Sequence, residues 1–258
     1  MTELRMPDSK VIRFARYDGA DTALPRWPDI PAAGLESGSP VQGGITYFEE
    51  PKIGLSAGVW ECTAFTGKME PYPVHEFMLL LEGEVTIAEA GGKTTTVRAG
   101  ESFIIPRGLT CQWKQPGYVK KYFVIFEEPA SAPVAKNTPG VIKLDHRLIP
   151  TETSPAPAAE TLFGPVPQQR SRDSYTDPSG QLMIGIWDTS YYHRKIVPFP
   201  RYELMHILEG SVSMTHDDGS VQAFAAGDTL FVPFGTMADF KVGGDYLRKI
   251  YVIFAPHG

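Results

Sequence analysis

The sequence predicts an all-β protein built from two similar barrels in tandem. Of its 258 residues, 25 are glycine and 23 are proline, and this many turn formers favours short strands over long helices. Short β-branched and aromatic runs, such as EFMLLLEG and ESFIIPRG, lie between the turns. The segment GVWECTAF at Gly58 recurs as GIWDTSYY at Gly185, 127 residues later, which indicates an internal repeat.

The repeat extends well beyond this segment. From Gly58 to Gly108 the first copy aligns with the second without a gap, and 16 of the 51 aligned pairs are identical. Each copy ends in a β-rich run, KKYFVIF in the first and RKIYVIF in the second. The opening VIRF at Val11 is echoed by VIKL at Val141. We interpret the pattern as a tandem duplication in which each copy is long enough to form its own core.

The duplication predicts the domain boundaries. We expect an N-terminal domain over residues 1–128, a connector rich in Pro and Ala over residues 129–140, and a C-terminal domain over residues 141–258. Two further irregular, Pro-rich stretches, 20–42 and 151–169, occupy matching places in the copies. We expect them to lie over the outside of the barrels, with a lid as the less common alternative.

Composition excludes several classes of function. The net charge is -6 and neither half is basic, so we expect no nucleic-acid partner. The longest apolar run, Ile250 to Ala255, is too short to span a bilayer, and the start MTELRMPDSK has no apolar signal core. Two cysteines, Cys62 and Cys111, do not make a disulfide scaffold. We therefore expect a cytoplasmic protein without a membrane partner.

A spaced motif carries a family resemblance. In each copy LEG is followed about 16 residues later by AG, an acidic residue, four residues and P-x-G. This pattern resembles the cupin superfamily. With Trp60 before it and Trp113 after it, the pattern is most similar to the cupins of (S)-ureidoglycine aminohydrolases and of ethanolamine utilisation. The resemblance covers residues 45–127 and 172–255. It implies two double-stranded β-helix (jelly-roll) barrels arranged as a bicupin.

The resemblance also implies where a metal would lie. Cupins commonly use H-x-H, a Glu four residues later, and a third His five residues after the proline of P-x-G. In the first copy the Glu falls on Glu76, and the two leading His positions fall on Glu70 and Tyr72. The third falls on Cys111. Glu70, Tyr72 and Glu76 share strand parity, so all three are expected to point inward if the strand continues through Pro71 and Pro73.

In the second copy, only the carboxylate is present among the four corresponding ligand positions. Glu203 takes the Glu position, and the other places hold Val197, Phe199 and Ala238, which cannot ligate a metal. We expect no metal there. We also expect an apolar cavity with one acid that packs or binds a small ligand.

Metal binding in the first copy remains an open alternative. Glu70, Glu76 and Cys111 are candidate ligands of one divalent ion: Mn, Fe or Zn. The favoured interpretation is a polar pocket without metal, because transition-metal sites usually draw on imidazole. The aminohydrolase resemblance, with its Glu, His, His and Gln around manganese, matches Glu70 to the first ligand and Gln112 to the last.

Two functions from different classes follow. The first is an aminohydrolase-like enzyme on a small polar, nitrogen-containing metabolite, with its site in the N-terminal barrel and Glu70, Tyr72 and Glu76 as catalytic groups. The second is a metal-free bicupin that binds or senses a small molecule. A homodimer is one oligomeric state that we consider. The residues expected to contact the ligand are Cys111, Gln112, Trp113 and Glu203. In either case we expect Glu76→Gln to abolish function and Glu203→Gln to affect mainly stability.

Overall fold

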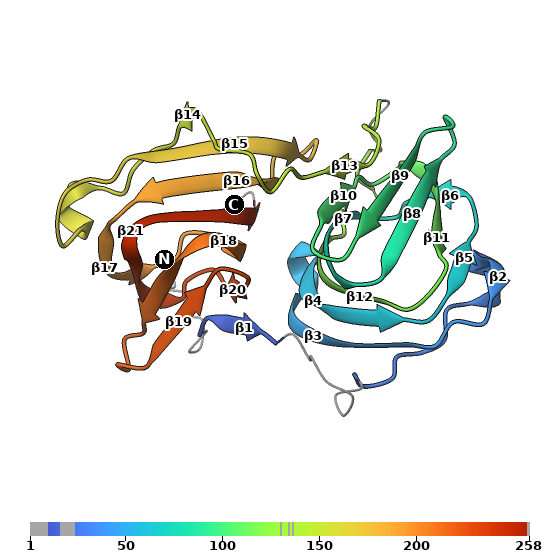
Figure 1. Cartoon of the computed structure of the whole chain (residues 1–258), viewed down its shortest axis with the longest axis horizontal. Coiled ribbons are helices and arrows are strands. Elements are labelled where there is room, and N and C mark those ends of the chain that lie inside the picture. Colours follow the sequence, from blue (N-terminus) through green and yellow to red (C-terminus); the bar gives the residue numbers. More distant parts are fainter. Residues whose placement is uncertain (1–9, 16–23, 130, 134, 136, 257–258) are drawn as a thin grey trace. The chain divides into compact units, whose positions relative to one another are not determined.

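The computed structural model describes residues 10–15, 24–129, 131–133, 135 and 137–256 (Figure 1). The chain divides into two compact units of strands. One unit is Arg16–Leu144, here called the N-terminal barrel. The other comprises Met1–Ala15 with Asp145–Gly258, here called the C-terminal barrel. The two barrels confirm the all-β, tandem jelly-roll expectation.

The N-terminal barrel contains two antiparallel sheets. The first sheet has the order β13 (Ile142–Lys143), β10 (Ser102–Ile105), β7 (His75–Glu82), β12 (Val119–Phe126), β4 (Leu55–Cys62) and β3 (Gln42–Glu50). The second has the order β2 (Leu35–Gly38), β5 (Phe65–Gly67), β11 (Thr110–Gln115), β8 (Glu84–Glu89) and β9 (Thr94–Arg98), and β6 (Glu70–Pro71) pairs with β11. Short 3-10 turns occur at η1 (Ala32–Gly34) and η2 (Pro51–Ile53).

The C-terminal barrel repeats this pattern in one continuous sheet. Its order is β1 (Ile12–Phe14), β20 (Thr229–Val232), β18 (Tyr202–Thr215), β21 (Met237–Phe254), β16 (Leu182–Ser190), β15 (Gln169–Thr176) and β14 (Glu152–Thr153). In addition, β17 (His193–Pro198) pairs with β21, β19 (Val221–Ala225) pairs with β18, and η3 (Ala159–Thr161) is a 3-10 turn.

The register confirms that the copies are structurally equivalent. Glu76 lies opposite Ile105 and Ile125 in the N-terminal barrel. Glu203 lies opposite the corresponding Val232 and Ile253 in the C-terminal barrel. The two carboxylates therefore occupy the same place in their barrels.

The glycine of each LEG motif has a steric reason. Gly83 and Gly210 adopt φ of 78° and 79°, a conformation that residues with a Cβ rarely adopt. A Cβ at either position would also lie about 2 Å from a backbone carbonyl oxygen, that of Tyr118 or Tyr246 (2.1 and 2.2 Å). Only glycine lets the strand turn there.

The domain boundaries differ from the expected ones at two places. β1, from the VIRF motif, pairs Ile12 with Phe231 in the C-terminal barrel. The matching VIKL motif forms β13, which pairs Ile142 with Ile104 in the N-terminal barrel. β1 and β13 therefore pair with equivalent strands, β20 and β10. Each motif belongs to one copy of the repeat and pairs with the barrel formed by the other copy. The expected connector at 129–140 consequently falls inside the N-terminal unit, and the units divide after Leu144.

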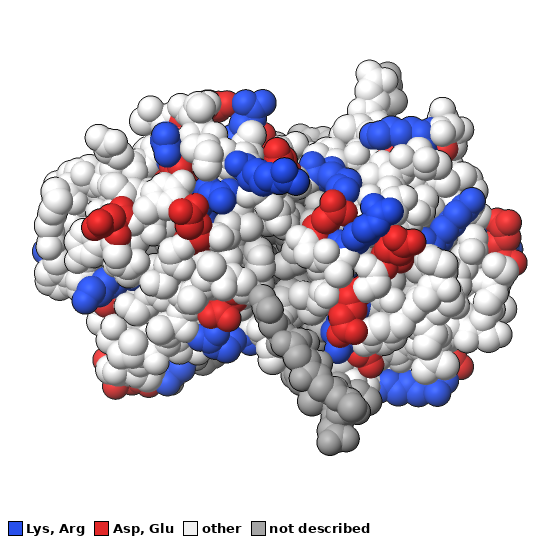
Figure 2. All heavy atoms as spheres, viewed as in Figure 1, with Lys and Arg blue, Asp and Glu red and all other residues white. Residues whose placement is uncertain are grey.

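Charge is mixed over the surface. Acidic and basic side chains are interspersed on the face drawn in Figure 2, in keeping with the modest net charge of -6. Among the described residues, no helix is long and apolar enough to cross a membrane.

Candidate functional site

A buried ion pair lies at the centre of the N-terminal barrel. Nζ of Lys121, on β12, is 2.7 Å from Oε1 of Glu76, on the neighbouring β7. The hydroxyl of Tyr72 donates a hydrogen bond to Oε2 of the same carboxylate. The ammonium lies over the rings of Trp60 and Trp113, at 4.8 and 4.9 Å from their centroids. Both carboxylate oxygens of Glu76 are therefore engaged.

The C-terminal barrel repeats the pair and changes its surroundings. Nζ of Lys249 is 2.6 Å from Oε1 of Glu203, and Nε of Arg201 is 3.1 Å from Oε2. Trp187, the counterpart of Trp60, lies 4.7 Å from the Lys249 ammonium. Burial alone would raise the pKa of Glu203, but the charges of Lys249 and Arg201 outweigh it and lower the pKa to about 2. Glu203 is thus an ionised carboxylate between two cations.

Sequence reasoning missed the two lysines. Lys121 and Lys249 stand within the apolar runs KKYFVIF and RKIYVIF, at the same place in each copy. A charged residue inside a strand that is otherwise apolar must be paired when the strand is buried. The recurrence of a lysine at the same place in both runs was the signal that was available.

The structure brings together part of the predicted N-terminal site. Tyr72, Cys111 and Trp113 line a cavity of about 350 Å³, and Glu70 is at its exposed edge. Glu70 is therefore not an inward catalytic group as expected, because the short strand β6 leaves its side chain in solvent.

Cys111 and Gln112 lie on opposite faces of β11, as strand alternation requires. Burial, with a smaller contribution from Glu89, raises the pKa of the Cys111 thiol to about 11, so the thiol stays protonated. Gln112 donates to Glu36 and, at 3.0 Å, to the carbonyl of Gly67. The amide is therefore engaged away from the cavity that Cys111 lines.

The cavity of the C-terminal barrel is polar, and the expectation of an apolar cavity with a lone acid is wrong. It has a volume of about 370 Å³ and is lined by both Glu203 and Lys249. Arg194, Arg201 and Tyr251 also line it. The expected contrast between the barrels is thus reversed, because sequence counting considered only the three ligand positions and not the neighbouring strands.

One aromatic residue accounts for a difference between the interiors of the two barrels. The backbone N–H of Trp27 donates to Gln42 in the N-terminal barrel, as Ser154 does to Gln169 in the C-terminal barrel. Trp27 packs edge-on against Phe123 and so close to Gly44 that a Cβ there would lie 2.5 Å from the indole. Its counterpart Ser154 lines the C-terminal cavity instead. The Pro-rich stretches therefore contact the barrel interiors and do not merely cover the outside.

The residues predicted as metal ligands in the N-terminal barrel do not fit a divalent metal. Within the described chain, Glu70, Glu76 and Cys111 do not bring three ligand atoms within 4.8 Å of one another. The Cys111 thiol is held protonated, and burial followed by the charge of Glu76 raises the pKa of Tyr72 well above its usual value. A cation at Glu76 would also lie against the Lys121 ammonium.

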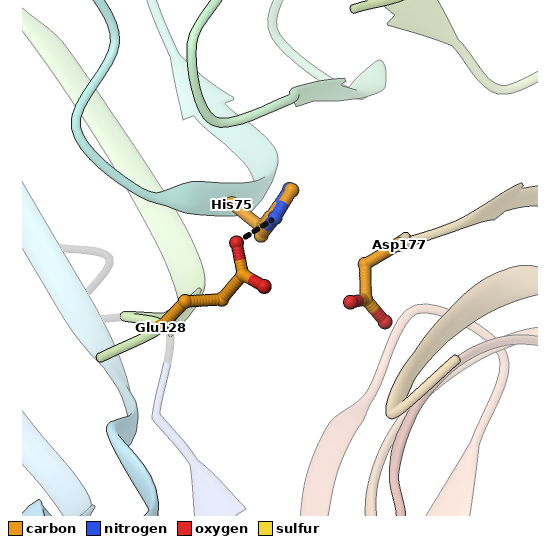
Figure 3. A group of neighbouring side chains, drawn as sticks. All are labelled: His75, Glu128 and Asp177. Atoms are coloured by element: carbon orange, nitrogen blue, oxygen red, sulfur yellow. Dashed lines mark hydrogen bonds and ion pairs between the residues drawn. The ribbon is translucent and has the colours of Figure 1, made fainter. Parts of the chain in front are cut away.

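His75, next to Glu76 in sequence, uses both ring nitrogens elsewhere. Its Nδ1 accepts the backbone N–H of Arg107 at 3.2 Å, so Nε2 carries the proton and faces Glu128 at 3.2 Å (Figure 3). The side chain is buried, and it lies on the face of β7 opposite Glu76, as strand alternation requires. Asp177, drawn in the same figure, belongs to the C-terminal barrel and accepts the backbone N–H of Ser179 and Leu182.

Two jelly-roll barrels with interior cavities define a bicupin. Residues 49–123 and 176–251 each match the model of the EutQ-like cupin domain. These matches span more than half of the sequence, and the chain belongs to this family. The aminohydrolase subtype suggested by the motifs is not established by them.

Solved structures share the fold. A protein of unknown function of the DUF861 family from Pseudomonas syringae pv. tomato is 28% identical, with a TM-score of 0.77 over 95% of this chain and 99% of its own. A cupin 2 conserved barrel domain protein from Leptotrichia buccalis is 10% identical, with a TM-score of 0.53 and coverage of 85% and 90%. Protein Ylba from E. coli is 12% identical, with a TM-score of 0.53 and coverage of 97% and 93%. No curated protein matches the sequence.

Proposed function

We propose that this protein is a metal-independent bicupin that binds a small metabolite in the cavity of its C-terminal barrel. The observation that carries the proposal is the buried Lys–Glu pair in each barrel. Lys249 and Lys121 place a fixed ammonium beside the carboxylate where a cupin metal would lie. Protein side chains therefore supply the positive charge that a metal supplies in other cupins.

The C-terminal cavity is the better binding site because the buried ion pair and two arginines line it. A volume of about 370 Å³ lies within the range of small-ligand pockets. Its walls combine apolar surface from Met183 and Phe199 with charged groups from Arg194, Arg201 and Lys249. In the N-terminal barrel, Trp27 takes up the space beside Phe123 and Gly44, and the described residues that line the remaining cavity include neither Glu76 nor Lys121.

The aminohydrolase reaction suggested by the motifs has less support. A general base must direct a lone pair at the substrate proton, and Glu76 is not among the described residues that line the N-terminal cavity. Glu76 accepts from both Lys121 and Tyr72, and Glu70 is exposed. An assay of ammonia release from (S)-ureidoglycine tests this alternative, and we expect no activity above a denatured control.

A pair of reciprocal variants tests the proposal. Ser154→Trp places in the C-terminal barrel the side chain that packs against Phe123 in the N-terminal one, and Trp27→Ser removes it from the N-terminal barrel. Protein is purified without chelator, and its metal content and its Tm with and without EDTA are measured. Compounds that it releases on denaturation, or that a metabolite library shows to raise its Tm, are then titrated into each variant.

The expected result is a substoichiometric metal content and a Tm that EDTA leaves unchanged. The compound should bind the wild type and Trp27→Ser and should fail to bind a folded Ser154→Trp. Stoichiometric metal whose removal lowers the Tm would contradict the proposal. Equal binding to wild type and Ser154→Trp would place the site elsewhere.

A further inference from the structure

The guanidinium of Arg194, on β17, has one edge without a hydrogen-bond partner inside the described part of the C-terminal barrel. Its Nε and Nη2 atoms are shielded from solvent and have no hydrogen-bond partner among the described residues. The guanidinium carbon lies 4.4 Å from the centroid of the Phe199 ring, which holds the planar group against one wall of the cavity. Buried donors on a charged group are costly to leave unpaired, so this edge calls for an acceptor.

The same barrel shows what acceptor fits this edge. Arg170 donates from Nε to Oδ1 of Asp188 at 2.9 Å and from Nη2 to Oδ2 at 2.6 Å. The pair of atoms left unpaired on Arg194 is thus the pair that elsewhere grips a carboxylate with two parallel hydrogen bonds. This geometry is specific to planar, two-oxygen acceptors.

The charges that line the cavity favour an acceptor with a single negative charge. Glu203 is neutralised by Lys249 and shares its second oxygen with Arg201. Asp173 accepts a hydrogen bond from the Tyr251 hydroxyl. Among the described lining residues, three cations (Arg194, Arg201 and Lys249) face these two carboxylates, which leaves an excess of one positive charge.

The N-terminal barrel lacks this arrangement. In the ungapped register of the two copies, Gly67 corresponds to Arg194 and Val74 corresponds to Arg201. Both barrels keep the Lys–Glu pair, but only the C-terminal barrel adds two arginines beside it. The arginines are therefore not part of what holds a barrel of this kind together.

We propose that the C-terminal cavity selects a small monocarboxylate, whose two oxygens pair with the Nε and Nη2 atoms of Arg194. The inference rests on the proposed function, because it names the class of ligand for the same cavity. The hydrocarbon part of the ligand lies against the apolar wall that Met183 and Met205 provide. Because the edge is shielded, binding includes a small rotation of the Arg194 side chain toward the ligand.

Matched probes and variants test the inference by calorimetric titration. The probes are acetate, propionate and benzoate, their amides (acetamide, propionamide and benzamide), and inorganic phosphate. The proteins are the wild type, Arg194→Met, Arg194→Lys and the control Arg172→Met, which replaces an exposed arginine outside the cavity. The Tm of each protein is measured without a probe.

We expect at least one carboxylate to bind the wild type and Arg172→Met, and its amide and phosphate to bind about tenfold more weakly or less. Arg194→Met should weaken carboxylate binding by about 10- to 100-fold, and Arg194→Lys, which keeps the charge but loses the planar edge, should fall between. The Tm of Arg194→Met should equal or exceed that of the wild type, because an unpaired buried group is removed. A purely structural arginine would instead lower it.

Other outcomes separate this inference from the proposed function. Amides that bind as tightly as carboxylates, with binding lost in Ser154→Trp but kept in Arg194→Met, overturn the carboxylate assignment and leave the cavity as the site. Carboxylate binding that survives Ser154→Trp overturns the location itself. Preferred binding of phosphate, or no binding of any carboxylate to the wild type, also overturns the inference.

Discussion

The two barrels have the same buried ion pair and different surroundings for it. In the N-terminal barrel, Glu76 is engaged by Lys121 and Tyr72, Trp27 packs against Phe123, and neither Glu76 nor Lys121 lines the cavity. In the C-terminal barrel, Glu203 lies between Lys249 and Arg201, and a polar cavity is open beside it. The comparison separates what the fold retains, the Lys–Glu pair, from what makes a binding site.

Removing one partner of each pair should give the largest effect and separate the barrels. Glu203→Gln leaves Lys249 and Arg201 without a counter-charge, whereas Glu76→Gln leaves Lys121 alone. We expect each change to lower the free energy of unfolding by about 3–5 kcal/mol, with the larger loss for Glu203→Gln. Urea denaturation at neutral pH measures both. A smaller loss for Glu203→Gln than for Glu76→Gln would show that Arg201 does not add to the charge left unpaired.

Removing both partners should cost far less. The double variant Glu203→Leu with Lys249→Met, and its counterpart Glu76→Leu with Lys121→Met, replace buried charges with apolar groups of similar size. Each should recover to within about 1–2 kcal/mol of the wild type, because the desolvation of the pair is removed together with its attraction. A double variant that is as destabilised as the corresponding Glu→Gln variant would mean that the pair is a net source of stability.

The dependence of the free energy of unfolding on acidic pH should test the role of Glu203. The pKa of Glu203 is lowered from 4.5 to about 2, so its ionised form stabilises the folded state fully above pH 4.5. That contribution is lost as the pH falls through the range toward 2. We therefore expect the free energy of unfolding of the wild type to fall more steeply between pH 4.5 and 2 than that of the Glu203→Leu/Lys249→Met variant. Parallel pH profiles for the two proteins would contradict a lowered pKa of Glu203 in the folded state.

The smallest expected effect is at Cys111, where the second copy has Ala238. Cys111→Ala removes a buried, protonated thiol that makes no ion pair with its neighbours among the described residues. We expect a loss of about 1 kcal/mol and no change in ligand binding, since the proposed site is in the other barrel. A large loss of binding on this change would move the function back to the N-terminal barrel.

The sequence predicted the architecture because each of its signals is local. Turn glycines such as Gly83 and Gly210 mark positions that no other residue can occupy, and the repeat places Glu76 and Glu203 in one register. The boundaries at β1 and β13 could not be predicted, because the two edge strands that they cover are alike, so pattern alone does not say which copy each strand pairs with.

The site was predicted only in part for a similar reason. Counting along one strand identifies Tyr72 and Glu76 but does not reveal the lysine on the strand beside it. Arg194 and Ser154 reach the cavity through a β-bulge and an irregular segment, where no simple period applies. Their contribution depends on which strands and loops close the barrel, and this is a property of the tertiary structure.

The central claim is that a lysine ammonium occupies, in both barrels, the place where other cupins hold a metal. The most direct test is a crystal structure of protein grown with millimolar manganese chloride, with an anomalous difference map calculated at the manganese edge. We predict that Nζ of Lys121 and Nζ of Lys249 remain beside Glu76 and Glu203, with no anomalous peak at coordination distance from either carboxylate. A manganese peak on Glu76 or Glu203, with the lysine displaced, would contradict the claim.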